Sequence, residues 1–102
     1  MSVSVLTNEN FDSEVIGSQK VCLVDFFATW CGPCKIMSPV VDEIAAENPD
    51  IFVGKLDVDE ADEIAERYSI MSIPTLMVFK NGEAVRTFVG VTDKQEIVSA
   101  LK

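Results

Sequence analysis

The 102-residue sequence predicts an α/β fold, in which a mixed five-stranded central sheet is flanked by four helices on its two faces. Two observations support this prediction. Strand-like and helix-like apolar patterns alternate through the first 80 residues, as expected for parallel strands joined by right-handed crossovers. An Asn81-Gly82 pair then separates two strand-like segments, which is a strong signal for an antiparallel hairpin. The length favours a single domain over residues 1–102.

The first two strands flank a predicted helix. Residues 3–6 are a short strand candidate, and a helix is expected to start at Thr7-Asn8 and to stop at Gly17. Residues 21–28 form an apolar run that only Asp25 interrupts. Such a run is typical of a central strand that is covered on both faces.

The middle of the chain predicts a long helix, a strand and a second helix. Apolar residues at helical spacing follow two cysteines, so we expect a helix over residues 31–48 with a kink at Pro39. The next strand is predicted at residues 51–58. Asp59 is expected to cap a helix that ends at Tyr68.

The last part of the chain predicts the hairpin and a closing helix. Residues 75–80 and 83–89 are the two hairpin strands, joined by Asn81-Gly82. A final helix is expected from about Thr92 or Asp93, with Ile97, Val98 and Leu101 packing inward.

Composition narrows the class of protein. The net charge of −9 gives no electrostatic support for nucleic-acid binding. No apolar run approaches the ~20 residues that span a membrane, and the first residues lack the basic and apolar regions of a signal peptide. Three cysteines do not suit a secreted disulfide framework, so we expect a cytoplasmic protein.

The segment Trp30-Cys31-Gly32-Pro33-Cys34 is the strongest chemical signal in the chain. A strand that leads directly into a helix places Cys31 at the helix N-terminus, where free N–H groups and the dipole favour an exposed, nucleophilic thiolate. Cys34 lies one turn further along the same face and is expected to be the resolving thiol. The pair therefore predicts a reversible dithiol–disulfide switch. Structural zinc is disfavoured, because only Cys22 and carboxylates remain as further ligands.

The residues around the two cysteines set their redox tendency and their surroundings. Gly32 permits close approach of a substrate backbone, and Pro33 lacks an N–H and stiffens the turn. Because Pro33 withholds the positive donor that a histidine would offer to the thiolate, the motif favours a reductant. Cys22 alternates with the apolar residues of its strand and is interpreted as a core thiol.

Further segments along the chain join the cysteine motif in a recognisable pattern: Val24-Asp25-Phe26, Trp30-Cys31-Gly32-Pro33-Cys34, Lys35, Pro39, Lys55, Ile73-Pro74-Thr75, Phe79-Lys80-Asn81-Gly82 and Gly90. On these segments the chain resembles the thioredoxin family over essentially its whole length. The resemblance implies the thioredoxin fold and a general protein-disulfide reductase, an electron carrier in cell redox homeostasis that binds no cofactor. It also implies a protein that reduces disulfide-containing proteins and is recharged by a thioredoxin reductase. The sequence gives no sign of an obligate oligomer, so we expect a monomer.

The resemblance also implies roles for three residues outside the cysteine motif. Asp25 is expected to lie buried behind Cys34 and to accept its proton, with Lys55 as its charge partner. Position alone is equally consistent with an exposed strand-end carboxylate at Asp25, and at Lys55 it favours a solvated lysine. Pro74 is expected to follow a cis peptide bond and to leave the Ile73 backbone free to pair with an extended substrate, although sequence alone favours trans.

The resemblance further implies an apolar rim for substrate around Cys31. Core packing is the competing interpretation for the apolar members other than Trp30. Three departures from the family leave partner preference open: Phe27 stands where most members have a second tryptophan, and Ser72 and Val91 replace small residues. The rim is formed by Trp30, Val58, Ile73, Gly90 and Val91.

Two other functions stay open at this point. A disulfide oxidase or isomerase is disfavoured by the missing signal peptide and by the absence of histidine. A redox-independent binding module or subunit would use Trp30 and Ile73 as a docking patch. The sequence does not distinguish an NADPH-linked from a ferredoxin-linked reductase.

Overall fold

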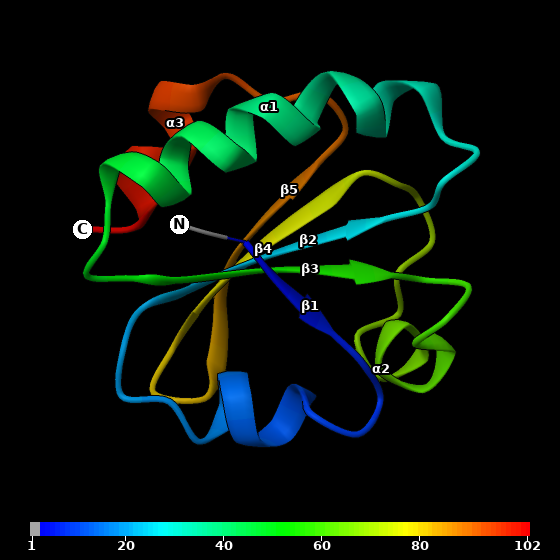
Figure 1. The fold of residues 1–102 in the computed structure, drawn as a ribbon, viewed down its shortest axis with the longest axis horizontal. Helices are drawn as coiled ribbons and strands as arrows, with labels where there is room; N and C mark the ends of the chain where they lie inside the picture. The colour runs from blue at the N-terminus through cyan, green and yellow to red at the C-terminus, as the bar shows by residue number, and fades with distance from the viewer. Residues whose placement is uncertain (1–2) are drawn as a thin grey trace.

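The computed structural model describes residues 3–102 and consists of a five-stranded sheet between two layers of helices (Figure 1). The sheet order is β1-β3-β2-β4-β5, with parallel pairing among the first three strands and antiparallel pairing of β4 with β2 and β5. This arrangement confirms the predicted mixed sheet. The elements are β1 (Ser4–Leu6), the π-helix η1 (Asp12–Ile16), β2 (Cys22–Phe27), α1 (Gly32–Glu47), β3 (Phe52–Asp57), α2 (Asp62–Arg67), β4 (Thr75–Lys80), β5 (Glu83–Val89) and α3 (Lys94–Ala100).

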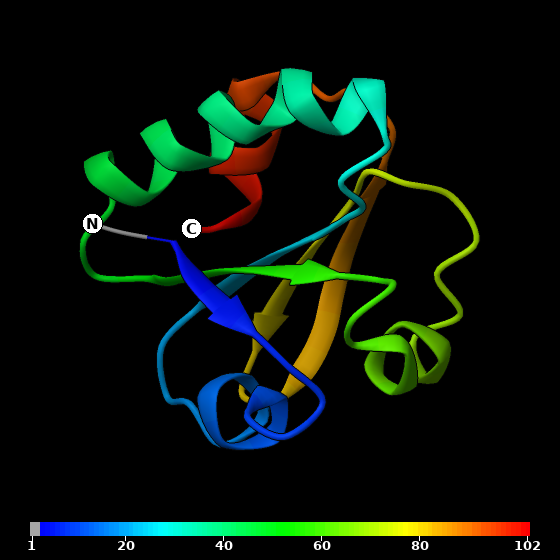
Figure 2. The same cartoon turned by 45° about the vertical axis from the view of Figure 1, so that its right-hand side comes forward.

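Helices α1 and α3 cover one face of the sheet, and η1 and α2 cover the other (Figures 1 and 2). Strand β2 is therefore buried on both sides, as its apolar run predicts. On the α1 face, Leu23 packs in a cluster with Met37 and Ile44. On the opposite face, the Phe79 ring contacts the rings of Phe11 and Tyr68 at centroid separations of 5.8 and 5.4 Å.

The first helix is shorter than predicted and of a different type. A helix was expected from Thr7, but residues 8–10 form turns, Phe11 has helical dihedral angles, and the regular helix is Asp12–Ile16. The Thr7 N–H donates to Asn10 Oδ1 at 2.7 Å, and the Asn10 N–H donates to Thr7 Oγ1 at 3.1 Å. These reciprocal bonds form a capping box, and the Phe11 N–H donates to the Thr7 carbonyl oxygen at 3.1 Å. Thr7 therefore caps this segment as predicted, although the regular helix begins only at Asp12.

The helix predicted from Asp59 also begins later, at Asp62. The Asp59 carboxylate does not cap it, because it accepts a hydrogen bond from Trp30 Nε1 instead. The cap comes from a distant segment: the Ile64 N–H, in the first turn of α2, donates to Asn8 Oδ1 at 3.2 Å. This correction depends on contacts between residues that are far apart in the chain.

The C-terminal predictions are confirmed. Asn81 and Gly82 have φ of 54° and 81°, the left-handed pair that a tight two-residue hairpin turn needs. Helix α3 starts after Asp93, whose carboxylate accepts from the Gln95 N–H at 3.1 Å.

Helix α1 continues through Pro39 to Glu47.

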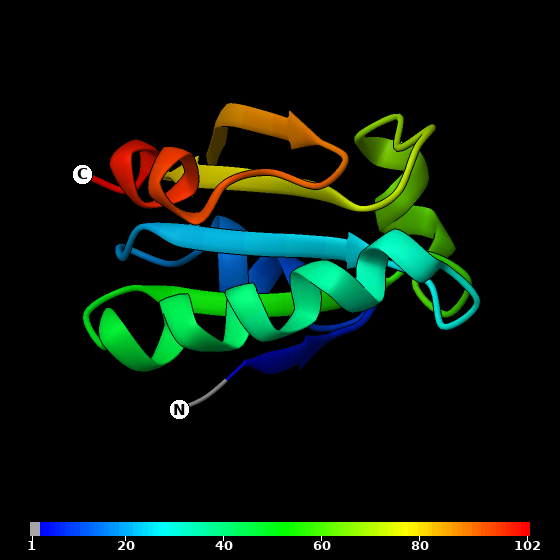
Figure 3. The same cartoon turned by 90° about the horizontal axis from the view of Figure 1, so that it is seen from above.

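The sheet brings four loops together at one edge. Strands β2 and β5 run in the same direction, whereas β4 runs the opposite way (Figure 3). The carboxyl ends of β2, β3 and β5 and the start of β4 therefore meet at the end where α1 begins.

Across residues 3–102, no helix is both long and apolar enough to cross a membrane.

Replacing Gly82 by alanine should lower the free energy of unfolding by about 1–2 kcal/mol, because a Cβ is strained in the left-handed region. The added Cβ would also lie 3.0 Å from the carbonyl oxygen of Ile16. Urea unfolding measures the change. Gly17→Ala is the matched control, since Gly17 has φ of −81° and its added Cβ makes only ordinary contact. Equal destabilisation by the two substitutions would contradict the argument.

Candidate active site

Cys31 and Cys34 form a disulfide at the N-terminus of α1, with their Cα atoms 5.3 Å apart. Cys31 is the N-cap residue, and its Sγ accepts a hydrogen bond from the Cys34 N–H at 3.1 Å. Pro33, in the first turn, contributes no N–H. The amide donor and the dipole of the 16-residue helix both favour negative charge on Cys31 Sγ when the pair is reduced.

Cys31 is not exposed, contrary to the prediction. Its exposed fraction is 4%, the same as that of Cys34. The disulfide holds both sulfurs against Ala28, and Val58 and Ile73 pack over this cluster. Cys31 Sγ lies 3.8 Å from the carbonyl oxygen of Ile73. In the disulfide form, the bonded Cys34 and the loop that contains Ile73 therefore shield Cys31 Sγ, which was predicted to be exposed.

Trp30 is 70% exposed, yet its indole is held in place. Its Nε1 donates to Asp59 Oδ2 at 2.8 Å, and the Asp59 N–H donates to Asp57 Oδ1 at 2.9 Å. Asp59 was not predicted to be part of the site. It follows β3, which is parallel to β2, and the carboxyl ends of parallel strands meet at one edge of the sheet, so its position in the sequence could have indicated this role.

Asp25 is a buried carboxylate behind the disulfide, with an exposed fraction of 5%. No group within residues 3–102 donates a hydrogen bond to its Oδ1. Burial raises the pKa of Asp25 from 3.8 to about 6, the charge of Lys55 opposes this rise, and the charge of Asp42 adds to it. A carboxylate with this pKa is a stronger base than an ordinary aspartate.

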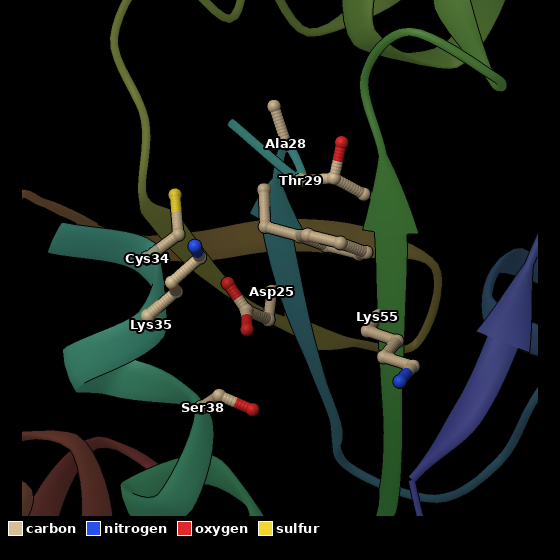
Figure 4. Close-up of a pocket in the computed structure, with 8 residues that line it drawn as sticks. Asp25, Ala28, Thr29, Cys34, Lys35, Ser38 and Lys55 are labelled. Carbon is tan, nitrogen blue, oxygen red and sulfur yellow. The ribbon is translucent and has the colours of Figure 1, made fainter. Parts of the chain in front are cut away.

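Lys55 lies opposite Asp25 in the parallel register of β2 and β3, but the two side chains do not form an ion pair within residues 3–102. Lys55 is exposed. Both side chains line the pocket on the α1 face of the sheet, and the Asp25 carboxylate is directed toward α1, but the end of the Lys55 side chain lies away from that carboxylate (Figure 4). The lysine therefore acts on the pKa of Asp25 through space rather than by contact.

A pocket of about 280 Å³ connects Asp25 with Cys34 (Figure 4). Its volume exceeds the roughly 30 Å³ that one water molecule occupies in the liquid, so it is large enough for water between the two groups. Ser38 was not predicted at the site, although its spacing of four residues from Cys34 on a helix is a usable signal. The pocket is lined by Asp25, Phe27, Ala28, Thr29, Cys34, Lys35, Ser38 and Lys55.

The loops that face the disulfide contain the other predicted residues. The Ile73–Pro74 peptide bond is cis. Gly90 has φ of +88°, and its N–H donates to the carbonyl oxygen of Pro74 at 2.8 Å, which links the two loops. Val91 is 58% exposed, whereas Val58 and Ile73 are half-buried. Among the described residues, none apart from Gly90 and its two chain neighbours has an atom within 4 Å of where a Cβ would stand on Gly90, so open space adjoins the loop.

Cys22 lies in the core with an exposed fraction of 1%, as predicted, and burial raises the pKa of its thiol. In the described part of the chain, no group of three or more cysteine, aspartate or glutamate side chains is arranged to hold a metal ion.

A disulfide at a helix N-terminus, on a sheet of this topology, defines a thiol-disulfide oxidoreductase. The family model for thioredoxin matches residues 2–102. The chain belongs to the thioredoxin family. It is 51% identical over 102 residues to a thioredoxin of Pyropia yezoensis, covering 99% of this chain and 95% of that protein. It is 50% identical to a thioredoxin of Porphyra purpurea, with the same coverage. It is 42% identical over 99 residues to a thioredoxin of Chlamydia pneumoniae, covering 97% and 95%.

Asp25→Asn should raise the free energy of unfolding of the disulfide form at about pH 7, by up to about 3 kcal/mol. Between about pH 4 and pH 6 the folded wild type binds more protons than the unfolded chain, so its stability falls as the pH rises. Asparagine removes that slope. Urea unfolding across this pH range measures both effects. The exposed carboxylate of Asp50 supplies the control Asp50→Asn, and an unchanged slope in Asp25→Asn would contradict the assignment.

Asp59→Ala should lower the steady-state fluorescence anisotropy of the protein, because the freed indole of Trp30 rotates more widely. Trp30 is the single tryptophan in the chain, so the signal reports on this ring alone. Asp59→Asn keeps an acceptor oxygen and should preserve most of the wild-type value. The same anisotropy in Asp59→Ala as in wild type would show that the hydrogen bond does not restrain the ring.

Proposed function

We propose that this protein is a general protein-disulfide reductase, in which Cys31 attacks a partner disulfide and Cys34 resolves the mixed disulfide. The observation that carries the proposal is the Cys31–Cys34 disulfide at the N-terminus of α1, with the Cys34 amide directed at Cys31 Sγ. This geometry favours the thiolate of Cys31 over that of Cys34. Gly32 and Pro33, which separate the two cysteines, favour a pair that acts as a reductant rather than as an oxidant.

In the first step, the Cys31 thiolate attacks one sulfur of the partner disulfide. A Cys31–partner disulfide forms, the partner's sulfur–sulfur bond breaks, and the leaving thiolate takes a proton from solvent. The helix N-terminus stabilises the attacking thiolate without a metal or cofactor.

In the second step, Cys34 attacks Cys31 Sγ, so the Cys31–Cys34 bond forms and the Cys31–partner bond breaks. The second partner sulfur leaves as a thiolate and takes a proton from solvent. Asp25 accepts the proton of Cys34, through water in the pocket that both groups line. Its raised pKa suits it to this role, and Lys55 limits the rise. Two electrons pass from the dithiol to the partner, so one disulfide is reduced to two thiols while the Cys31–Cys34 disulfide forms.

Partner proteins are proposed to bind across the rim of Trp30, Val58, Ile73, Gly90 and Val91. The backbone of Ile73, beside Pro74, would pair with an extended segment of the partner, and its carbonyl is already 3.8 Å from Cys31 Sγ. Open space beside Gly32 and Gly90 leaves room for the approaching chain.

The protein returns to the dithiol form through a thioredoxin reductase, which supplies two electrons while solvent supplies two protons. We propose that residues 1–102 act as one thioredoxin domain and as a monomer in cellular electron transport. A reducing cytoplasm suits this role, because the dithiol is the active form.

A redox-independent binding function is a second candidate. It is favoured by the exposed side chains of Trp30 and Val91, at 70% and 58%. A partner that binds the Cys31→Ser/Cys34→Ser double variant as tightly as wild type would support this use of the same surface.

Cys31→Ser should abolish reduction of insulin, whereas Cys34→Ser should accumulate a mixed disulfide with its substrate, because attack persists but resolution is lost. Turbidity measures insulin reduction, and non-reducing electrophoresis detects the adduct. Cys22→Ser is the control, since this buried thiol lies outside the site. Full activity in Cys31→Ser would refute the proposal.

A further inference from the structure

A second pocket, of about 200 Å³, lies beside the loop that faces the disulfide. Its inner residues, Thr75 and Met77, are buried, with exposed fractions of 3% and 6%. Its outer residues, Met71 and Val89, are 92% and 63% exposed, and Tyr68 also lines it. We call it the Met71 pocket. An apolar side chain entering from solvent would meet both the buried and the exposed residues.

The lining determines what the Met71 pocket can hold. A quarter of the residues in the chain are charged, but none of the described residues that line this pocket is. A charged group placed there would lose hydration without gaining a counter-charge. The volume is below that of ordinary small-molecule sites, yet a cavity of about 150 Å³ already accommodates a benzene ring. The pocket therefore suits one large uncharged side chain.

The Met71 pocket is continuous with the path of a substrate. Ser72 and Thr75 line it, and they flank the Ile73–Pro74 pair. The carbonyl oxygen of Ile73 faces Cys31 Sγ. Thr75 pairs with Val89 across β4 and β5, so the pocket lies along these strands just beyond Ile73. Ser72 and Thr75 stand one and two positions from Ile73, and an extended chain advances about 3.3 Å per residue. A segment that delivers its cysteine to Cys31 therefore reaches the pocket within a few residues.

We propose that the Met71 pocket is a specificity subsite that takes one large apolar side chain of a protein partner. That side chain is a leucine, isoleucine, methionine or phenylalanine, within a few residues of the reacting cysteine. The inference rests on the proposed disulfide-reductase function and adds the class of partner sequence that this chain prefers. Apolar burial at a site away from the sulfurs strengthens binding of the partner without changing the chemical step.

The test uses alanine- and serine-based peptides with one cysteine, joined by a disulfide to a small aromatic thiol. One leucine is moved from four residues before the cysteine to four residues after it. Pre-reduced protein is mixed with each peptide, and release of the aromatic thiol is followed under single-turnover conditions. The concentration dependence gives an apparent dissociation constant and a limiting rate for each peptide.

A leucine at the matching position should lower the apparent dissociation constant by about 5- to 10-fold and leave the limiting rate unchanged. Val89→Asp and Met71→Asp should each remove most of this preference, because a carboxylate at the pocket disfavours an apolar occupant. Val85→Asp is the matched control: Val85 is an exposed valine on the same strand, 45% exposed, and does not line the pocket. It should retain the preference.

Equal constants for every leucine position in the wild type would overturn the subsite, as would a loss of the preference in Val85→Asp equal to that in Val89→Asp. Failure of the proposed function has a different signature. A wild-type protein that releases no thiol from any peptide, and none from a small symmetrical aromatic disulfide, would refute disulfide exchange itself. Exchange with all peptides at one constant would refute only the subsite.

Discussion

The junction between β2 and α1 is the constraint on which the rest of the molecule depends. Strand β2 is paired on both sides and buried between two helical layers, so its carboxyl end has little freedom. The chain leaves this strand and enters α1 within a few residues, which fixes Cys31 as the N-cap and directs the Cys34 amide at its sulfur. The polar end of a long helix is thereby aimed at the atom that must carry negative charge during disulfide exchange.

The same burial has an energetic consequence for Asp25. A carboxylate in the middle of β2 loses hydration and finds no donor for its Oδ1 among the described residues. The lost hydration destabilises the folded protein at neutral pH, and it also raises the basicity of the group that faces Cys34 across a pocket. Stability and basicity thus depend on the same buried carboxylate, and the charge of Lys55 opposes only part of the rise in its pKa.

The surface around the disulfide divides into parts with different chemistry. Trp30 is tethered to the carboxylate of Asp59, which keeps a large aromatic ring ordered at an exposed position. Beyond Ile73, the uncharged Met71 pocket offers an apolar contact. The surface beside the disulfide therefore presents a tethered aromatic ring on one loop and an uncharged pocket beside another.

The sequence by itself determined the features that arise from neighbouring residues. The apolar run of β2, the left-handed Asn81-Gly82 turn, the Asp93 cap and the spacing of Cys31 and Cys34 are local patterns, and each was correctly predicted. Only the tertiary structure decided the burial of Cys31, the capping of α2 by Asn8, the pairing of Asp59 with Trp30 and the direction of the Lys55 side chain. Each of these depends on residues from distant segments, because the fold, and not the local sequence, determines which polar groups and covering side chains meet at the edge of the sheet.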